Sequence, residues 1–249
     1  MPLETQFGTK DEVTYGTPVV VDRFEPFISE SIQPETFRTR VPTLRSGKQT
    51  SGSTEYAAGI LGYAGSVEIP ALSKGFGLWL TRALGTTATA GPTDGAYTHT
   101  STWAGSSLTV AAAAVPVTSI TLSGDNKLKT DRHYQRANTR RDQAPRSDYP
   151  EITIEFEADW DSVTQYDRFV AETAAGTQAA VVWTCEAPTE IASGVAPGIV
   201  ATMAAVDFTE VTANVSGPEM MMQTISGLVL DNYSAEPISV VYTSEDVTP

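Results

Sequence analysis

Residues 151–186 constrain the fold more than any other stretch, because two unlike periodicities follow one another there. In the first part, acidic and hydroxyl side chains alternate with apolar ones, and successive side chains of a β-strand point to opposite faces. One face carries Ile152, Ile154, Phe156, Ala158 and Trp160. The other face carries Glu151, Thr153, Glu155, Glu157 and Asp159. The alternation predicts a half-buried strand with an acidic outer side.

A helix and a second strand are expected next. Ser162 and Gln165 have the spacing of a capping box, and Gly176 suits the left-handed residue that ends a helix. Between them, apolar residues at helical spacing predict a helix with one apolar face, formed by Val163, Tyr166, Phe169, Val170 and Ala174. The run from Gln178 to Glu186 predicts the second strand.

The rest of the chain is dominated by short β-type runs separated by turn residues. The expected strands are Val19–Ser31, Gly62–Pro70, Ala96–Trp103, Ser107–Leu122, Gly198–Val211, Met220–Leu230 and Ile238–Ser244. A helix is expected from Ala71 to Leu84, and Asp231-Asn232 predicts a turn. The fold class is therefore mainly β (α+β), with flanking α-helices.

Charge is distributed unevenly along the chain. Residues 147–249 contain 17 acids and one base, Arg168, although the whole chain has a net charge of only −14. The bases gather in two loops, expected from Thr36 to Ala58 and from Gly124 to Tyr149. Their members are Arg38, Arg40, Arg45 and Lys48 in the first loop, and Lys127, Lys129, Arg132, Arg136, Arg140, Arg141 and Arg146 in the second. Basic loops and an acidic body favour docking between copies of the chain, although simple solvation of the loops stays open.

The order of elements suggests three parts. Residues 1–18 form an N-terminal arm, residues 19–112 a first half, and residues 113–249 a second half with the C-terminal strands. Both halves have the order strand, basic loop, strand, helix, strand, so a tandem duplication is one interpretation, and a single domain is the other.

The sequence contains no pattern typical of an enzyme or a metal site. His99 and His133 lie in different segments without cysteine partners, and the single cysteine, Cys185, falls in an expected strand and is expected to be a small buried hydrophobe. No phosphate-binding loop or nucleophile elbow is present. We therefore expect no catalytic residues, no metal and no cofactor. The start lacks a secretory signal, and no run is long enough to span a membrane.

Several stretches resemble the major tail tube protein of long-tailed (siphovirus-type) phages and related viruses. They are Asp11–Pro18 (DEVTYGTP), Phe24–Ile32 (FEPFISESI), Gly75–Gly85 (GFGLWLTRALG) and the close from Ile225 to Asp246. The resemblance implies an antiparallel β-sandwich or barrel that assembles into rings. It implies that the rings stack head to tail into a tube, the conduit for genome delivery, in the virion tail after assembly in the host cytoplasm.

The resemblance also implies partners and roles. The chain itself would be the main partner, as six chains per ring or as three chains with pseudo-sixfold symmetry. A tape-measure protein and double-stranded DNA would pass through the lumen, and tail terminator and tail tip proteins would close the ends. The residues that would contact neighbouring subunits or rings are Arg38, Arg40, Arg45, Lys48, Arg132, Arg136, Arg140, Arg141 and Arg146. We expect some of the acids Glu151, Glu155, Glu157 and Asp159 to line the lumen, and the tube exterior is the competing position. A tail terminator, neck or decoration protein, and a carbohydrate-binding β-sandwich, are the alternatives.

Overall fold

The structure is a computed structural model. It describes residues 6–14, 17–40, 56–71, 75–85, 105–129, 145–171, 178–190, 195–213 and 221–244. The chain divides into two compact units. Unit 1 comprises Met1–Pro70 and Lys127–Tyr149, and unit 2 comprises Ala71–Asn126 and Pro150–Pro249. The proposed duplication is a separate matter and stays a prediction.

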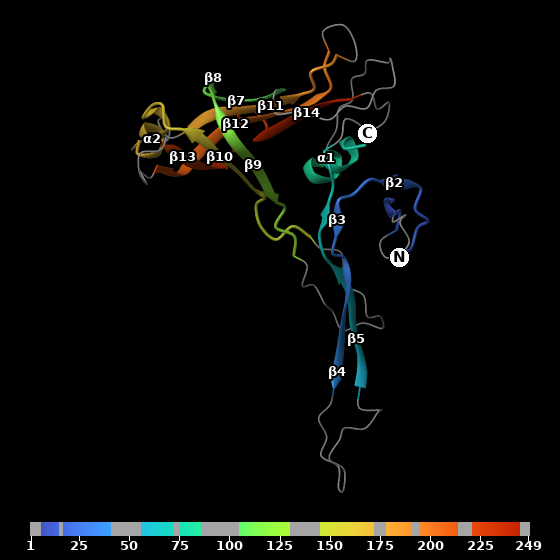
Figure 1. The fold of residues 1–249 in the computed structure, drawn as a ribbon. Coiled ribbons are helices and arrows are strands. Elements are labelled where there is room, and N and C mark those ends of the chain that lie inside the picture. The colour runs from blue at the N-terminus through green and yellow to red at the C-terminus, as the bar shows by residue number, and fades with distance from the viewer. Residues whose placement is uncertain are drawn as a thin grey trace. The chain divides into compact units, whose positions relative to one another are not determined.

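Unit 2 contains an eight-stranded antiparallel sheet, so the expected mainly-β fold is confirmed (Figure 1). Its order is β8-β7-β11-β12-β13-β10-β9, with β14 also paired to β12. The strands are β7 (Ser106–Val110), β8 (Ala113–Val115), β9 (Val117–Asp125), β10 (Glu151–Asp159), β11 (Gln178–Glu186), β12 (Gly198–Ala213), β13 (Met222–Val229) and β14 (Ile238–Thr243). The predictions for β10 and β11 match these bounds, and those for β12 to β14 agree within two residues.

The central strand β12 organises this sheet. It pairs with β11 along one edge, and with β14 and then β13 along the other. Two register shifts interrupt its pairing, and the buried positions change phase at both. The buried residues of β12 are first Ala201, Met203 and Ala205, next Val206 and Phe208, and last Val211. Their every-second-residue alternation therefore breaks after Ala205 and again after Phe208. A β-bulge adds one residue to a strand, so the two bulges keep the apolar side chains on one face of a long, bent strand.

That face is the hydrophobic core. Its members come from β7, β10, β11, β12 and β13, and they are Leu108, Val110, Ile154, Phe156, Ala179, Val181, Met203, Val206, Phe208, Val211, Ile225 and Val229. Phe156, Val181, Met203, Val206 and Ile225 have no exposed surface.

The run Ser107–Leu122 was expected as one strand and is three. A two-residue turn separates β7 from β8, with Ala111 and Ala112 at φ of 50° and 63°. Positive φ at both central residues is the geometry of tight hairpin turns, in which Asn and Gly are usual. The alanines conceal the turn from sequence reasoning.

The two described helices of unit 2 are shorter than expected. Helix α1 (Gly77–Leu84) ends at Gly85, whose φ is 86° and whose N–H donates to the Thr81 carbonyl. Just before α1, the Phe76 ring contacts Tyr242 of β14 at a centroid distance of 6.2 Å. Helix α2 (Thr164–Phe169) ends well before Ala174, and residues 172–177, including Gly176, lie outside the described residues.

Two predictions about α2 are wrong. Its N-cap is Val163, and no side chain caps the helix, so Ser162 and Gln165 form no capping box. The expected apolar face is not buried either, because Gln165 is the buried residue and Val163, Tyr166, Phe169 and Val170 are exposed. The spacing of apolar residues predicted a helix at this place correctly, but not the side that it turns inward.

The described residues of unit 1 form three two-stranded antiparallel sheets and one isolated β-bridge. The sheets are β1 (Phe7–Thr9) with β2 (Arg23–Glu25), β3 (Ser29–Glu30) with β6 (Val67–Glu68), and β4 (Gln33–Arg40) with β5 (Tyr56–Ala64). The strand expected over Val19–Ser31 is therefore two short strands, and the one expected over Gly62–Pro70 is divided between β5 and β6. The long loop expected from Thr36 to Ala58 is also wrong in extent, because its two ends pair in the β4–β5 hairpin, which Figure 1 shows as a long narrow ribbon.

Candidate assembly surfaces

The acidic side of β10 continues across neighbouring strands. Glu155 lies opposite Thr121 of β9 and Ser226 of β13, and Ser226 lies opposite Glu210 of β12. The next row joins Ser119, Glu157, Thr224 and Thr212 in the same way. Side chains directly opposite on antiparallel strands share a face, so these rows form one polar surface. We call it the acidic face.

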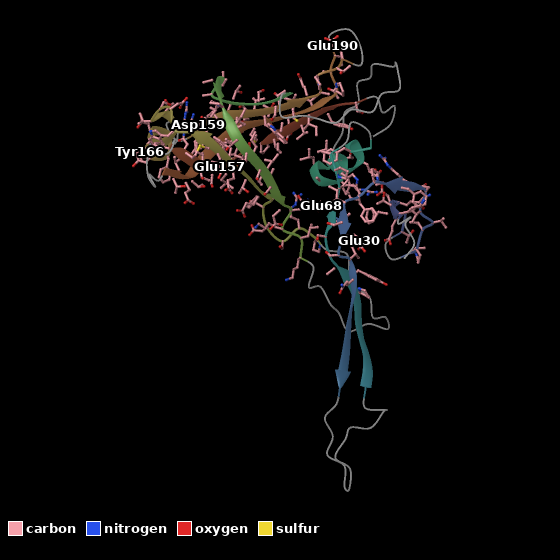
Figure 2. All side chains as sticks on the ribbon, viewed as in Figure 1. Glu30, Glu68, Glu157, Asp159, Tyr166 and Glu190 are labelled. Atoms are coloured by element: carbon pink, nitrogen blue, oxygen red, sulfur yellow. The ribbon has the colours of Figure 1, made fainter. Side chains whose placement is uncertain are left out.

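The residues of the acidic face include carboxylates and hydroxyls but no base. Glu151, Glu155 and Glu157 are exposed as predicted, whereas Asp159 is half-buried. Ser119 Oγ donates a hydrogen bond of 3.2 Å to Glu157 Oε2, which helps to hold that carboxylate on the sheet. Figure 2 labels Glu157 and Asp159 on β10. The four predicted acids are therefore brought together on one strand.

Three further acids of this face were missed by sequence reasoning. Asp125 pairs with Glu151 in the register of β9 and β10, Asp207 lies opposite Leu228, and Glu210 lies opposite Ser226. Asp207 and Glu210 have different parity along β12, and only the bulge between Phe208 and Glu210 places both on the same side. The sequence contains no signal for that bulge, so alternation alone could not group them.

The basic residues belong to unit 1. Arg38 and Arg40 lie on β4, in register with Ala58 and Tyr56 of β5. Arg146 is exposed and forms a β-bridge with Leu128. The other predicted contact residues, Arg45, Lys48, Arg132, Arg136, Arg140 and Arg141, lie outside the described residues.

The second basic segment is closed at its base like the first. Lys129 N–H donates to the Pro145 carbonyl, and Ser147 N–H donates to the Lys127 carbonyl, both at 2.9 Å. Ser147 Oγ also donates to the Lys127 carbonyl, at 2.8 Å. These bonds join residues 127–129 to residues 145–147 as antiparallel neighbours. Both basic segments thus begin and end at paired backbone.

The division into units is also a division of charge. Unit 1 contains 13 Lys and Arg and 12 Asp and Glu, a net charge of +1. Unit 2 contains 3 Lys and Arg and 18 Asp and Glu, a net charge of −15. The chain therefore presents two surfaces of unlike character, and such surfaces can bind head to tail between copies.

Other kinds of site find little support. Within the described ranges no group of three His, Cys, Asp or Glu residues is placed to hold a metal ion. Cys185 is a free cysteine and half-buried, so it is less buried than expected. His99 and His133 are outside the described residues. Among the helices that the structure describes, none has the length and apolar content to cross a membrane.

The fold and these surfaces define a mainly-β protein with an acidic sheet face and a second unit that contains most of the bases. The family model for the phage tail tube protein matches residues 86–229, which is more than half of the chain. The chain therefore belongs to the phage tail tube protein family, and it is a structural protein of a phage tail.

The comparisons with curated proteins and with solved structures add little to this family assignment. No curated protein matches the chain. Among solved structures, the cryo-EM structure of the anti-feeding prophage cap (AFP tube terminating cap) is similar, at 11% sequence identity and a TM-score of 0.39. The match covers 60% of this chain and 96% of that one. A similarity this distant carries no conclusion about role.

Proposed function

We propose that this chain is the tail tube subunit itself: copies form rings, and the rings stack head to tail into the conduit for the phage genome. Membership of the phage tail tube protein family carries this proposal. The siphovirus type, the passage of a tape-measure protein and DNA, and the contacts with terminator and tip proteins are parts of the same proposal. Rings of six chains, or of three chains with two tube-like halves each, both fit it.

The separation of charge supports head-to-tail assembly. A surface that binds an unlike surface on the next copy makes a heterologous contact, which yields closed rings or open filaments. The basic residues of unit 1 and the acids of unit 2 supply such unlike surfaces. We place Arg38, Arg40, Arg45 and Lys48, together with Arg132, Arg136, Arg140, Arg141 and Arg146, at contacts between subunits or stacked rings.

The acidic face supports a role as lumen wall. Carboxylates repel DNA phosphates, so an anionic wall lets the genome slide without binding. We assign Glu151, Glu155, Glu157 and Asp159 to the lumen and extend the assignment to Asp207 and Glu210. A cryo-EM structure of the assembled tube checks this directly. A map with all of these acids on the tube exterior or at a ring interface would reject the lumen assignment.

Negative-stain microscopy of the purified protein separates the roles. Stacked tubes are expected for a tube subunit, single closed rings for a terminator, and monomers for a carbohydrate-binding or decoration module. The tube role is abandoned if only single rings form at every protein concentration and salt concentration tried.

A charge reversal in the second basic loop tests whether this loop contacts neighbouring subunits or stacked rings. The triple variant Arg136→Glu, Arg140→Glu, Arg141→Glu is expected to block polymerisation, while circular dichroism shows an unchanged fold. The matched control is the triple substitution of the same residues by Lys, which keeps the charge and is expected to polymerise. Normal tubes from the Glu variant would remove the loop from the contact.

A further inference from the structure

Helix α2 leaves several of its apolar side chains partly exposed. Val163 is 54% exposed, Tyr166 42%, Phe169 37% and Val170 49%. The rings of Trp160, Tyr166 and Phe169 form a continuous row, with centroid distances of 6.1 and 6.4 Å. We call Val163, Tyr166, Phe169 and Val170 the α2 patch. Exposed apolar residues in such a cluster, with aromatic rings among them, are typical of protein–protein contacts.

The side of α2 that faces the protein contributes little to the stability of the helix. Gln165 is its buried residue, and Gln165 Oε1 and Arg168 Nε are buried atoms without a hydrogen-bond partner in the described part of the chain. No side chain caps the helix, which has only six residues. Isolated helices of this length are unstable in water, so α2 depends on packing. Among the described residues, Tyr166 contacts the rings of Trp160 and Phe169, and the apolar side of α2 still keeps much of its surface exposed.

The distribution of charge indicates which molecule contacts the α2 patch. Exposed Asp161 and Asp167 border the α2 patch, and unit 2 as a whole is strongly acidic. Unit 1 contains most of the bases and also exposes apolar side chains, including Phe24, Ile28 and Tyr63. An apolar patch with an acidic rim is complementary to such a surface. The contact has to join unlike surfaces, because two α2 patches facing each other would make a closed pair instead of a ring.

We propose that the α2 patch docks on a second copy of this chain, against unit 1 of that copy. The proposal rests on the proposed self-assembly and names one of its contacts. It makes the α2 patch a subunit interface in addition to the basic loops. Figure 2 labels Tyr166 on α2, at the same end of the sheet as Glu157 and Asp159.

The first experiment measures assembly of the double variant Tyr166→Glu, Phe169→Glu by sedimentation velocity over a range of protein concentrations. Aromatic residues at the centre of interfaces are frequent hot spots, so the concentration for half-assembly is expected to rise at least ~30-fold. Tyr233→Glu is the matched control, because Tyr233 is 96% exposed and belongs to the same unit. Circular dichroism and urea unfolding check that both variants fold.

Wild-type assembly by the Tyr166→Glu, Phe169→Glu variant would overturn the α2 proposal and leave the tube function standing. A wild-type protein that stays monomeric under all conditions would instead overturn the tube function, and the α2 contact with it. An equal loss of assembly in the Tyr233→Glu control would show that any added charge blocks assembly, which also overturns the specific role of α2.

The second experiment keeps the apolar character of the site. The photo-crosslinker p-benzoylphenylalanine replaces Phe169, and assembled protein is irradiated and digested. Intermolecular crosslinks to peptides of unit 1 are expected. Crosslinks to the α2 peptide of the second copy, crosslinks to unit 2 alone, or no more crosslinking than with the same probe at Tyr233 would overturn the proposal.

Discussion

Unit 1 and unit 2 place their apolar side chains in opposite ways. All the buried hydrophobic residues among the described ones belong to unit 2. In unit 1 the buried charged residue Glu25 is held by Arg23, while Val13, Val20, Phe24, Ile28 and Tyr63 are exposed. Two-stranded sheets without an apolar core are marginal in water. Unit 2 therefore has the interior of a stable domain, whereas the described part of unit 1 leaves several large apolar side chains exposed.

The largest expected difference in the free energy of unfolding is between alanine substitutions of one phenylalanine in each unit. Phe156 of β10 is fully buried, and Phe24 of β2 is 60% exposed. Phe156→Ala leaves a cavity in the core and is expected to lower the free energy of unfolding by about 3–5 kcal/mol. Phe24→Ala is expected to change it by less than about 0.5 kcal/mol, as is usual for exposed sites. Urea unfolding followed by circular dichroism measures both, and equal losses would contradict the contrast between the units.

The same contrast explains what the sequence could predict. In unit 2, alternation predicted β10, because a strand with one buried face repeats every two residues. The run from Gln178 to Glu186 predicted β11 with the bounds that the structure shows. In unit 1, the residues of β4 (QPETFRTR) and of the start of β5 do not alternate between apolar and polar in the sequence, so no periodicity marks these strands. The turn at Ala111 and Ala112 and the bulges of β12 were missed because their geometry depends on the surrounding sheet, not on turn-forming residues.

The candidate surfaces were predictable to a similar degree. Glu151, Glu155 and Glu157 could be grouped on one face because they lie on one strand. Asp207 and Glu210 join them only through strand pairing, which a single sequence does not show. The spacing of the apolar residues predicted an apolar face on α2, but it does not tell whether that face is buried or exposed. Whether the basic residues contact other copies stays a prediction.

Alanine substitution of one glycine in each unit tests further how tightly the two units are packed. A Cβ added to Gly227 of β13 would lie 2.5 Å from Val206 Cγ1, and one added to Gly8 of β1 would lie 2.4 Å from Val21 Cγ1. Val206 is fully buried, whereas Val21 is 40% exposed and can move aside. Gly227→Ala is therefore expected to cost about 1–3 kcal/mol, as overpacking of a core does. Gly8→Ala is expected to cost less than about 0.5 kcal/mol.

Thermal or urea unfolding of the two alanine variants measures this difference. Gly124→Ala is a control with an open site, since no atom lies within 4 Å of its added Cβ. A cost at Gly8 equal to that at Gly227 would mean that unit 1 is packed as rigidly as unit 2.

A smaller gain is expected at the hairpin turn of unit 2. Ala111 and Ala112 both have positive φ, which alanine adopts poorly. The double variant Ala111→Asn, Ala112→Gly supplies the residues that this turn type favours and is expected to raise the free energy of unfolding by about 0.5–1 kcal/mol. Chemical denaturation measures the gain. A loss of stability would indicate that the alanine side chains are needed in the turn.

The smallest expected effect lies in unit 1, at the exposed ion pair of Lys10 and Asp22. Lys10 Nζ donates a hydrogen bond of 2.6 Å to Asp22 Oδ2, and this bond, with the charge of Lys10, holds the pKa of Asp22 below its ordinary value. Because folding lowers this pKa, the stabilisation is present above the unfolded pKa and is lost as the pH falls through the folded pKa.

Lys10→Met is therefore expected to raise the pKa of Asp22 towards its ordinary value, as measured by NMR titration of the carboxyl carbon. Since exposed pairs contribute little and salt screens them, the variant is expected to assemble and unfold nearly as wild type does. A marked loss of stability confined to low ionic strength would show that unit 1 depends on this pair for its stability.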